Sequence, residues 1–163
     1  MKNILIVLIL LFAASLAFAE AMPNFRLPDI SGKNVELKDL LGKGPILVDF
    51  WADYCKPCKD AMPTLNALAE KYDSLTVVMV SIDAPKNMAK AKIYLKSKNF
   101  KFINLFDSEK TLAKKLSVSN PPHTFILDCK GEIVWTHVGY EPGMETAYEH
   151  HIRLLLGLET EAE

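Results

Sequence analysis

Cysteine is scarce in this sequence, and neither sign of charge dominates it. The 163 residues include three cysteines, Cys55, Cys58 and Cys129, and an odd number excludes a scaffold in which every cysteine is paired. There are 19 lysine and arginine residues against 20 aspartate and glutamate residues, so no excess of basic charge calls for nucleic acid as a partner. Internal repeats, low-complexity tracts and linkers are also missing, which favours a single domain.

An apolar run long enough to cross a membrane is missing as well. Residues 4–18 form an apolar stretch of 15 residues, whereas a transmembrane helix needs about 20. The stretch follows an early cation, Lys2, and ends near the triplet Ala17-Phe18-Ala19, which is typical of a secretory signal peptide. We therefore predict a signal peptide over 1–19, cleavage after Ala19 and export to the periplasm or cell envelope. A retained N-terminal anchor is the alternative.

The 144 residues after the predicted cleavage site suit one domain, which would bury about two thirds of the unfolded chain's surface. We expect this domain to span 20–163, with an N-terminal extension over 20–44. The acidic end, over 158–163, is predicted to be a frayed and solvated tail.

The segment WADYCKPCKD, residues 51–60, places Cys55 and Cys58 two residues apart. Such a pair can be a redox centre, half of a metal site or a structural staple. Two intervening residues enclose too small a loop for much entropic stabilisation, so the staple is the weak alternative. Outside the cytoplasm a bare dithiol tends to form a disulfide, which favours redox chemistry.

The surroundings of the pair favour disulfide exchange. The apolar run over 45–52 predicts a buried strand, and apolar residues at helical spacing predict a helix from about Lys56 to Tyr72. Cys55 would then lie at the N-terminus of that helix, where backbone N–H groups and the helix dipole stabilise a thiolate. Cys58, one turn further on and pointing inward, is predicted to be the more buried sulfur and the resolving thiol.

Asp49 interrupts the apolar run, six residues before Cys55. A carboxylate buried on both faces of a sheet is costly, and burial raises its pKa towards neutrality. We therefore predict that Asp49 lies beneath the cysteine pair and exchanges the proton of Cys58 as the disulfide opens and closes. The alternative is an edge strand with Asp49 facing water.

Strands and helices alternate along the rest of the chain. We expect an α/β fold with a mixed central sheet flanked by helices. The predicted strands are 75–83, 102–106, 123–128 and 132–138, and the predicted helices are 85–98, 108–116 and one that opens at Glu141-Pro142 and stops at Gly157.

Three segments give the chain a resemblance to a known family. ILVDFWADYCKPC resembles the active-site strand and turn of thioredoxins, and Pro122-His123-Thr124-Phe125 resembles their proline-threonine-phenylalanine segment. The stretch PNFRLPDISGKNVELKDLLGKGPILVDFWA is similar to the N-terminal pattern of TlpA-like and ResA-like extracytoplasmic thiol-disulfide oxidoreductases. The matching residues there are Phe25, Leu27, Gly32, Lys33, Leu37, Gly42 and Lys43.

The resemblance implies a thioredoxin-like fold with an N-terminal β extension. It implies Cys55 as nucleophile, Cys58 as resolving cysteine and Pro122 as a cis-proline packed against the pair. No cofactor beyond the Cys55–Cys58 disulfide and no metal is expected. The predicted partners are protein disulfides, among which apocytochrome c cysteines are a frequent substrate of the family, and a membrane thiol donor for re-reduction. We expect a monomer.

Substrate contacts are predicted for Trp51, Tyr54, Pro57 and Pro121. Four positions depart from the family pattern. Asp49 replaces an asparagine that is frequent in the exported members, and Tyr54 stands where tryptophan is usual. Ala84 falls where some ResA-like proteins carry an active-site glutamate, which leaves Asp49 as the predicted substitute. Pro121 precedes the predicted cis-proline and has no N–H to offer a substrate strand.

Three other functions remain open. Cys55, Cys58 and His123 form a possible zinc or copper(I) site, which would make the protein a metal-binding or delivery protein. A thiol peroxidase is the second alternative, although Ala52 stands where the peroxide-reducing relatives typically have a threonine, three residues before the reactive cysteine. A non-enzymatic binding domain is hard to reconcile with an intact cysteine pair.

Overall fold

The computed structural model describes residues 20–159. The predicted signal peptide and the end of the predicted tail, 160–163, lie outside the described residues. Within 20–159, no helix is both long and apolar enough to cross a bilayer. Glu159, near the start of the tail, accepts a hydrogen bond from Arg153 at 2.7 Å and pairs with His150 at 2.9 Å, so this residue is held against the last helix.

A five-stranded mixed sheet forms the centre of the molecule, in the order β5-β4-β3-β6-β7. β3 pairs in parallel with β4 and antiparallel with β6, and β4 and β5 are parallel. β7 pairs antiparallel with β6. The strands are β3 (Ile46–Trp51), β4 (Thr76–Ser81), β5 (Ile103–Phe106), β6 (His123–Leu127) and β7 (Ile133–Val138).

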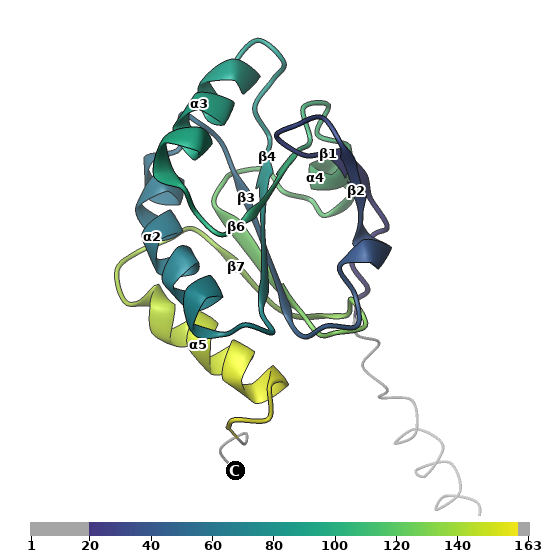
Figure 1. Ribbon diagram of the computed structural model, residues 1–163, viewed down its shortest axis with the longest axis vertical. Helices are drawn as coiled ribbons and strands as arrows, with labels where there is room; N and C mark the ends of the chain where they lie inside the picture. The colour runs from purple at the N-terminus through teal and green to yellow at the C-terminus, as the bar shows by residue number, and fades with distance from the viewer. Residues whose placement is uncertain (1–19, 160–163) are drawn as a thin grey trace, which may run out of the picture.

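Helices and a small N-terminal sheet cover the two faces of this sheet. In Figure 1, α2, α3 and α5 lie on one side, and α4 with the N-terminal strands lies on the other. The helices are α2 (Lys56–Lys71), α3 (Met88–Lys98), α4 (Thr111–Lys115) and α5 (Met144–Leu155). The N-terminal extension forms the antiparallel pair β1 (Arg26–Pro28) and β2 (Asn34–Glu36), followed by the short 3-10 helix η1 (Leu37–Asp39). The predicted α/β architecture with an N-terminal β extension is confirmed.

Hydrophobic patterning accounts for the elements that carry the site. Every residue of β3 is buried, because β3 is the central strand and has helices or strands against both faces. The buried positions of α2 recur at the spacing of one helical face, which packs on the sheet. They are Cys58, Ala61, Met62, Leu65 and Leu68.

Three predicted helices begin later than expected, each for a local reason. Residues 85–87 form a turn closed by Asn87 N–H to Ala84 O at 2.8 Å, so α3 starts at Met88. Asp107 accepts the N–H groups of Thr111 and Ala113 at 2.8 Å, which places the start of α4 at Thr111. Gly143 has φ +104°, a left-handed conformation that interrupts a helix opened at Glu141.

Candidate active site

Cys55 and Cys58 form a disulfide where the turn after β3 enters α2. Their Cα atoms are 5.4 Å apart, within the ordinary range for a disulfide. Cys55 is the N-cap residue of α2, and its Sγ accepts a hydrogen bond from the Cys58 N–H at 3.2 Å. Cys55 is 6% exposed and Cys58 is wholly buried. The predicted asymmetry between an outer and an inner sulfur is confirmed.

This position favours an anionic Cys55 once the disulfide is opened. The Cys58 N–H in the first helical turn donates to the sulfur, and the positive end of the helix dipole adds to its effect. Both stabilise the thiolate, which is the nucleophile in disulfide exchange and also a good leaving group. The local chain therefore provides an outer sulfur at a helix N-terminus backed by a shielded inner one.

Asp49 is buried in the middle of the central strand. Its neighbours across the sheet are Met79 on β4 and Thr124 on β6, and its own exposed fraction is 1%. The edge-strand alternative is therefore wrong. Burial raises the pKa of Asp49 to about 7, although the hydrogen bond from Thr124 opposes the shift. Within residues 20–159, Asp49 Oδ2 is buried without a hydrogen-bond partner.

Thr124 and Tyr148 complete the surroundings of this carboxylate. Thr124 Oγ1 donates to Asp49 Oδ1 at 2.7 Å and lies 3.4 Å from the Tyr148 hydroxyl. Burial raises the pKa of Tyr148 to about 12, so its hydroxyl stays protonated. Sequence reasoning found Thr124 only as part of a motif and missed Tyr148. The available signal for Thr124 was a hydroxyl in an otherwise apolar strand.

The peptide bond between Pro121 and Pro122 is cis. Phe50 pairs with His123 across β3 and β6, so Pro122 lies level with the end of β3, where the cysteine turn begins. Pro122 is buried, and its carbonyl accepts the Gly139 N–H at 2.8 Å. The chain thus brings the predicted cis-proline to the same end of the sheet as the cysteine pair.

The predicted substrate contacts divide by exposure. Tyr54 is 68% exposed, and Pro57 is also exposed. Pro121 is half-buried. Trp51 is wholly buried and packs against Tyr94 of α3 at a ring distance of 6.0 Å. The prediction of a substrate contact for Trp51 therefore needs correction. Its side chain is not accessible to a substrate and instead packs in the core beside the cysteine turn.

A second buried carboxylate, Asp83, holds the cysteine turn in place. It lies two residues after the end of β4, is 2% exposed, and its Oδ2 accepts the Asp53 N–H at 2.9 Å. The Ser81 hydroxyl donates to the same oxygen at 2.9 Å. Asp53 in turn accepts from Lys59 Nζ at 2.8 Å. Sequence reasoning missed Asp83, although an acid at the end of the apolar strand VVMVSID was the signal.

Comparison with known proteins places this geometry in a family. The family model described as AhpC/TSA matches residues 18–136. The chain belongs to the AhpC/TSA family. It is 36% identical over 117 residues to the thiol-disulfide oxidoreductase ResA of Bacillus cereus, covering 72% of this chain and 67% of that one. It is 31% identical over 112 residues to ResA of Bacillus subtilis, covering 69% and 62%. The aligned segment thus spans about two thirds of these relatives.

Solved structures give the same result for this member of the AhpC/TSA family. A structure assigned as the thiol:disulfide interchange protein DsbE of Chlorobium tepidum superposes with a TM-score of 0.78 at 32% identity, covering 88% of this chain and all of that one. The fold is thioredoxin-like. With its ResA relatives and its Cys55–Cys58 disulfide, the protein is a thiol-disulfide oxidoreductase.

His123 does not join the cysteines in a metal site in the described part of the chain. No group of three or more histidine, cysteine, aspartate or glutamate side chains within residues 20–159 has an arrangement that could hold a metal ion. The His123 ring instead stacks on Phe125 at 4.4 Å and hydrogen-bonds Thr136 at 3.1 Å. Partial burial lowers the pKa of His123. The structure therefore gives the metal-delivery alternative no support.

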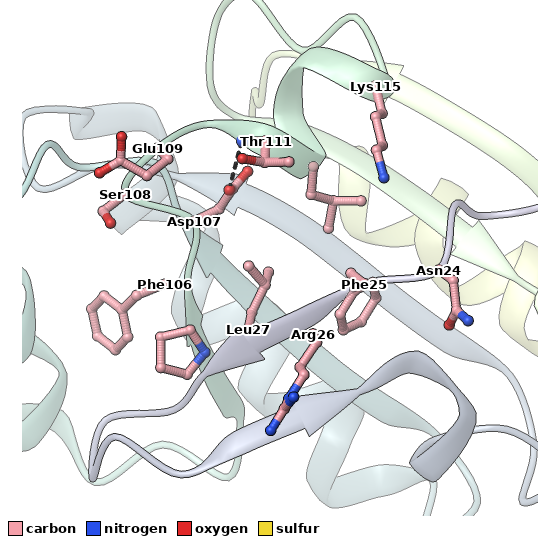
Figure 2. Close-up of a pocket in the computed structure, with 12 residues that line it drawn as sticks. Asn24, Phe25, Arg26, Leu27, Phe106, Asp107, Ser108, Glu109, Thr111 and Lys115 are labelled. Atoms are coloured by element: carbon pink, nitrogen blue, oxygen red, sulfur yellow. Dashed lines mark hydrogen bonds between the residues drawn. The ribbon is translucent and has the colours of Figure 1, made fainter.

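A cavity of about 300 Å³ lies elsewhere in this AhpC/TSA domain, between the N-terminal extension and the turn that leads into α4. Figure 2 shows Phe25 and Leu27 of the extension opposite Phe106, with Asp107 bonded to Thr111. None of the 12 lining residues is a cysteine. The cavity forms where the extension covers the sheet and takes no part in the redox site.

Proposed function

We propose that this protein reduces disulfides of other proteins outside the cytoplasm through the Cys55/Cys58 dithiol. The observation that carries the proposal is the Cys55–Cys58 disulfide at the N-terminus of α2, in a chain whose relatives are thiol-disulfide oxidoreductases. The ResA and DsbE names of the relatives support an extracytoplasmic location. The apolar stretch over 4–18 supports export by a signal peptide.

The reaction begins with attack of the Cys55 thiolate on the substrate disulfide. A mixed disulfide between Cys55 and one substrate sulfur forms, and the other substrate sulfur leaves as a thiolate. Cys58 then loses its proton and attacks Cys55 Sγ, which forms the Cys55–Cys58 disulfide and releases the second substrate thiol. Two electrons pass from the dithiol to the substrate.

Asp49 is the proposed acceptor of the Cys58 proton. Its pKa of about 7 is close to the working pH, which is the condition for an efficient general base. The same residue returns the proton when the disulfide is reduced again. The Thr124 hydrogen bond fixes the orientation of the carboxyl group and acts as a positioning contact.

The surface around Cys55 is the proposed substrate site. Tyr54 and Pro57 are exposed beside it, and we place Pro121 and the buried Pro122, in the segment just before β6, at its border. Pro121 presents only a carbonyl to an added substrate strand, because proline lacks an N–H. Pro57 and Asp49 resemble the reducing members of the thioredoxin superfamily, which favours the direction of reduction.

Turnover needs a partner that restores the dithiol. In an oxidising compartment the protein would otherwise accumulate as the disulfide, so we propose a membrane protein that donates thiols. Cysteines of apocytochrome c are the proposed substrate, by analogy with the ResA-like relatives. The disulfide itself carries the electrons, and we propose that the protein acts as a monomer without a further cofactor.

Trapping distinguishes the roles of the two cysteines. A Cys58→Ser variant should accumulate a mixed disulfide with a peptide disulfide through Cys55, because the resolving step is blocked. The matched Cys55→Ser variant should form little adduct, because Cys58 is wholly buried. Mass spectrometry of the quenched reactions measures both. Accumulation in Cys55→Ser instead would reverse the assignment, and rapid stoichiometric consumption of hydrogen peroxide by the reduced protein would favour a peroxidase.

A further inference from the structure

One segment of the described chain has a large net positive charge. Residues 84–106, which contain α3 and β5, carry six lysines and no acidic residue. The rest of 20–159 has twelve basic and eighteen acidic residues. The described chain is therefore neutral as a whole but strongly divided. The six lysines are Lys86, Lys90, Lys92, Lys96, Lys98 and Lys101.

These lysines are not neutralised within residues 20–159, where none of the six forms an ion pair. The acids that flank the segment, Asp83 and Asp107, are each 2% exposed. Both accept hydrogen bonds from nearby groups of the same chain. Lys92 lies over the Phe106 ring at 5.1 Å. The positive charge of the segment is thus left facing solvent.

Three exposed lysines of this segment lie within seven residues of an exposed apolar residue. Lys86, Lys90 and Lys96 are exposed, and Ile93, between Lys90 and Lys96 on α3, is 69% exposed. We call these four residues the α3 lysine face. An exposed apolar residue bordered by charged groups can serve as the centre of a contact with a polar rim.

The α3 lysine face lies on α3 and, for Lys86, on the turn before it, and α3 packs against the active-site turn. Tyr94 of α3 contacts Trp51 and lies 4.6 Å beneath Lys59 Nζ, one turn of α2 after Cys55. Figure 1 shows α3 beside the start of α2. A protein whose disulfide reaches Cys55 therefore also approaches α3.

Two acids near the cysteine pair in sequence that reach the surface, Asp53 and Asp60, do not cancel this charge. Asp53 is paired with Lys59 at 2.8 Å, and Asp60 with Lys56 at 2.6 Å. Each of these acids is thus balanced by a cation of its own, which leaves the lysines of α3 without a neighbouring acid from this turn.

We infer that the α3 lysine face is a docking surface for acidic residues next to the disulfide of a protein substrate. This inference rests on the proposed function and specifies the class of substrate. Complementary charge beside a reactive site raises the rate of productive encounter, and the effect weakens as salt is added. Ile93 supplies an apolar contact at the centre of the face.

An acidic protein segment fits this face better than an anionic membrane does. A helix that lies on a membrane needs a broad apolar side to insert. The apolar residues Ala91 and Leu95 of α3 are instead buried in the protein core, which leaves Ile93 alone among the lysines.

The test compares three peptides that contain the same disulfide, flanked by glutamate, glutamine or lysine. The reduced full-length protein is mixed with each peptide, and the rate of peptide reduction is measured by quenching and chromatography. We expect the glutamate peptide to react about five to ten times faster than the glutamine peptide at low salt. The ratio should approach one in 1 M NaCl, where the screening length is about 3 Å. The net charge of the chain, −1, would by itself give the opposite preference.

Matched variants separate the face from the overall charge. Lys90→Glu/Lys96→Glu should abolish or reverse the preference for the glutamate peptide. Lys43→Glu/Lys130→Glu changes the net charge by the same amount. These two lysines lie in loops at the opposite end of β3 from the cysteines, where the Gly42 N–H donates to Cys129 O. This control variant should keep the preference for the glutamate peptide. Both variants should reduce 2-hydroxyethyl disulfide, which is uncharged, at the wild-type rate.

Three outcomes would overturn the inference. The first is equal rates for the three peptides with the wild-type protein, and the second is loss of the preference in both double variants. The third is binding to phosphatidylglycerol vesicles that Lys90→Glu/Lys96→Glu alone abolishes, without any peptide preference, which would assign the face to a membrane. Failure to reduce any disulfide, including 2-hydroxyethyl disulfide, would instead refute the proposed function.

Discussion

Replacing Asp49 with asparagine should stabilise the oxidised protein at alkaline pH and leave it nearly unchanged in acid. Asparagine has almost the same shape, and its Oδ1 can still accept the Thr124 hydroxyl, which donates to Asp49 at 2.7 Å. What the substitution removes is the ionisation of a carboxyl group that is 1% exposed. The comparison therefore isolates the cost of a buried charge.

The magnitude follows from the difference between two pKa values. An unfolded aspartate titrates near 3.9, whereas Asp49 in the folded protein titrates at about 7. Between these values the folded state holds the proton more tightly, so stability falls as the pH rises through this window and is constant above it. Three pKa units correspond to a total of about 4 kcal/mol, of which about 2 to 3 kcal/mol falls between pH 5 and pH 8.

Urea unfolding of the oxidised protein measures this difference. The disulfide prevents Cys55 and Cys58 from titrating, and other groups contribute equally to wild type and variant. The stability gain from Asp49→Asn should grow by about 2 to 3 kcal/mol from pH 5 to pH 8. A gain that is the same at both pH values, or that shrinks as the pH rises, would refute the assignment of a raised pKa to Asp49.

The remaining predictions concern three positions around the site. Thr124→Val removes the hydrogen bond that lowers the pKa of Asp49, so the pH profile of disulfide exchange should move to higher pH; an unmoved profile would limit Thr124 to packing. Cys129→Ser should leave exchange rates unchanged, because this exposed thiol lies beyond the far end of β6, about 16 Å of strand from Pro122; a lower rate would contradict this. Pro121→Thr should tighten binding of extended peptide disulfides about fivefold by restoring one N–H donor, with small disulfides unaffected; weaker peptide binding would show that the missing donor does not limit recognition.

The sequence predicted best the features that depend on a single element. The apolar run around Asp49, the helical spacing after Cys58 and the cap position of Cys55 all follow from patterns within a few residues. From these patterns we predicted the buried strand, the helix, and that Cys58 is the more buried of the two sulfurs. The cis bond before Pro122 was predicted from family resemblance alone, since no local pattern distinguishes it.

The contacts that sequence reasoning missed join residues far apart in the chain. Asp49 meets Thr124 across a sequence separation of 75, and Asp53 meets Asp83 across 30. Strand register and the position of a turn decide such contacts, and neither can be read from spacing within one segment. Trp51 was misassigned for the same reason, because the burial of its ring depends on Tyr94, which arrives with the later helix α3.

The burial that raises the pKa of Asp49 both lowers the stability of the folded protein at neutral pH and suits Asp49 to its proposed role as proton acceptor. A solvated aspartate with a pKa near 3.9 would accept a proton from a thiol with a pKa near 8.5 only against a difference of about 4.6 units, or about 6 kcal/mol. At about 7 for Asp49, the difference from an ordinary thiol falls to about 1.5 units, or about 2 kcal/mol. The smaller difference is the physical reason for proposing that Asp49 takes the Cys58 proton as the disulfide closes and returns it as the disulfide opens. An asparagine at this position would stabilise the fold but could do neither, so the stability gain of Asp49→Asn and the loss of proton transfer should appear together over the same range of pH.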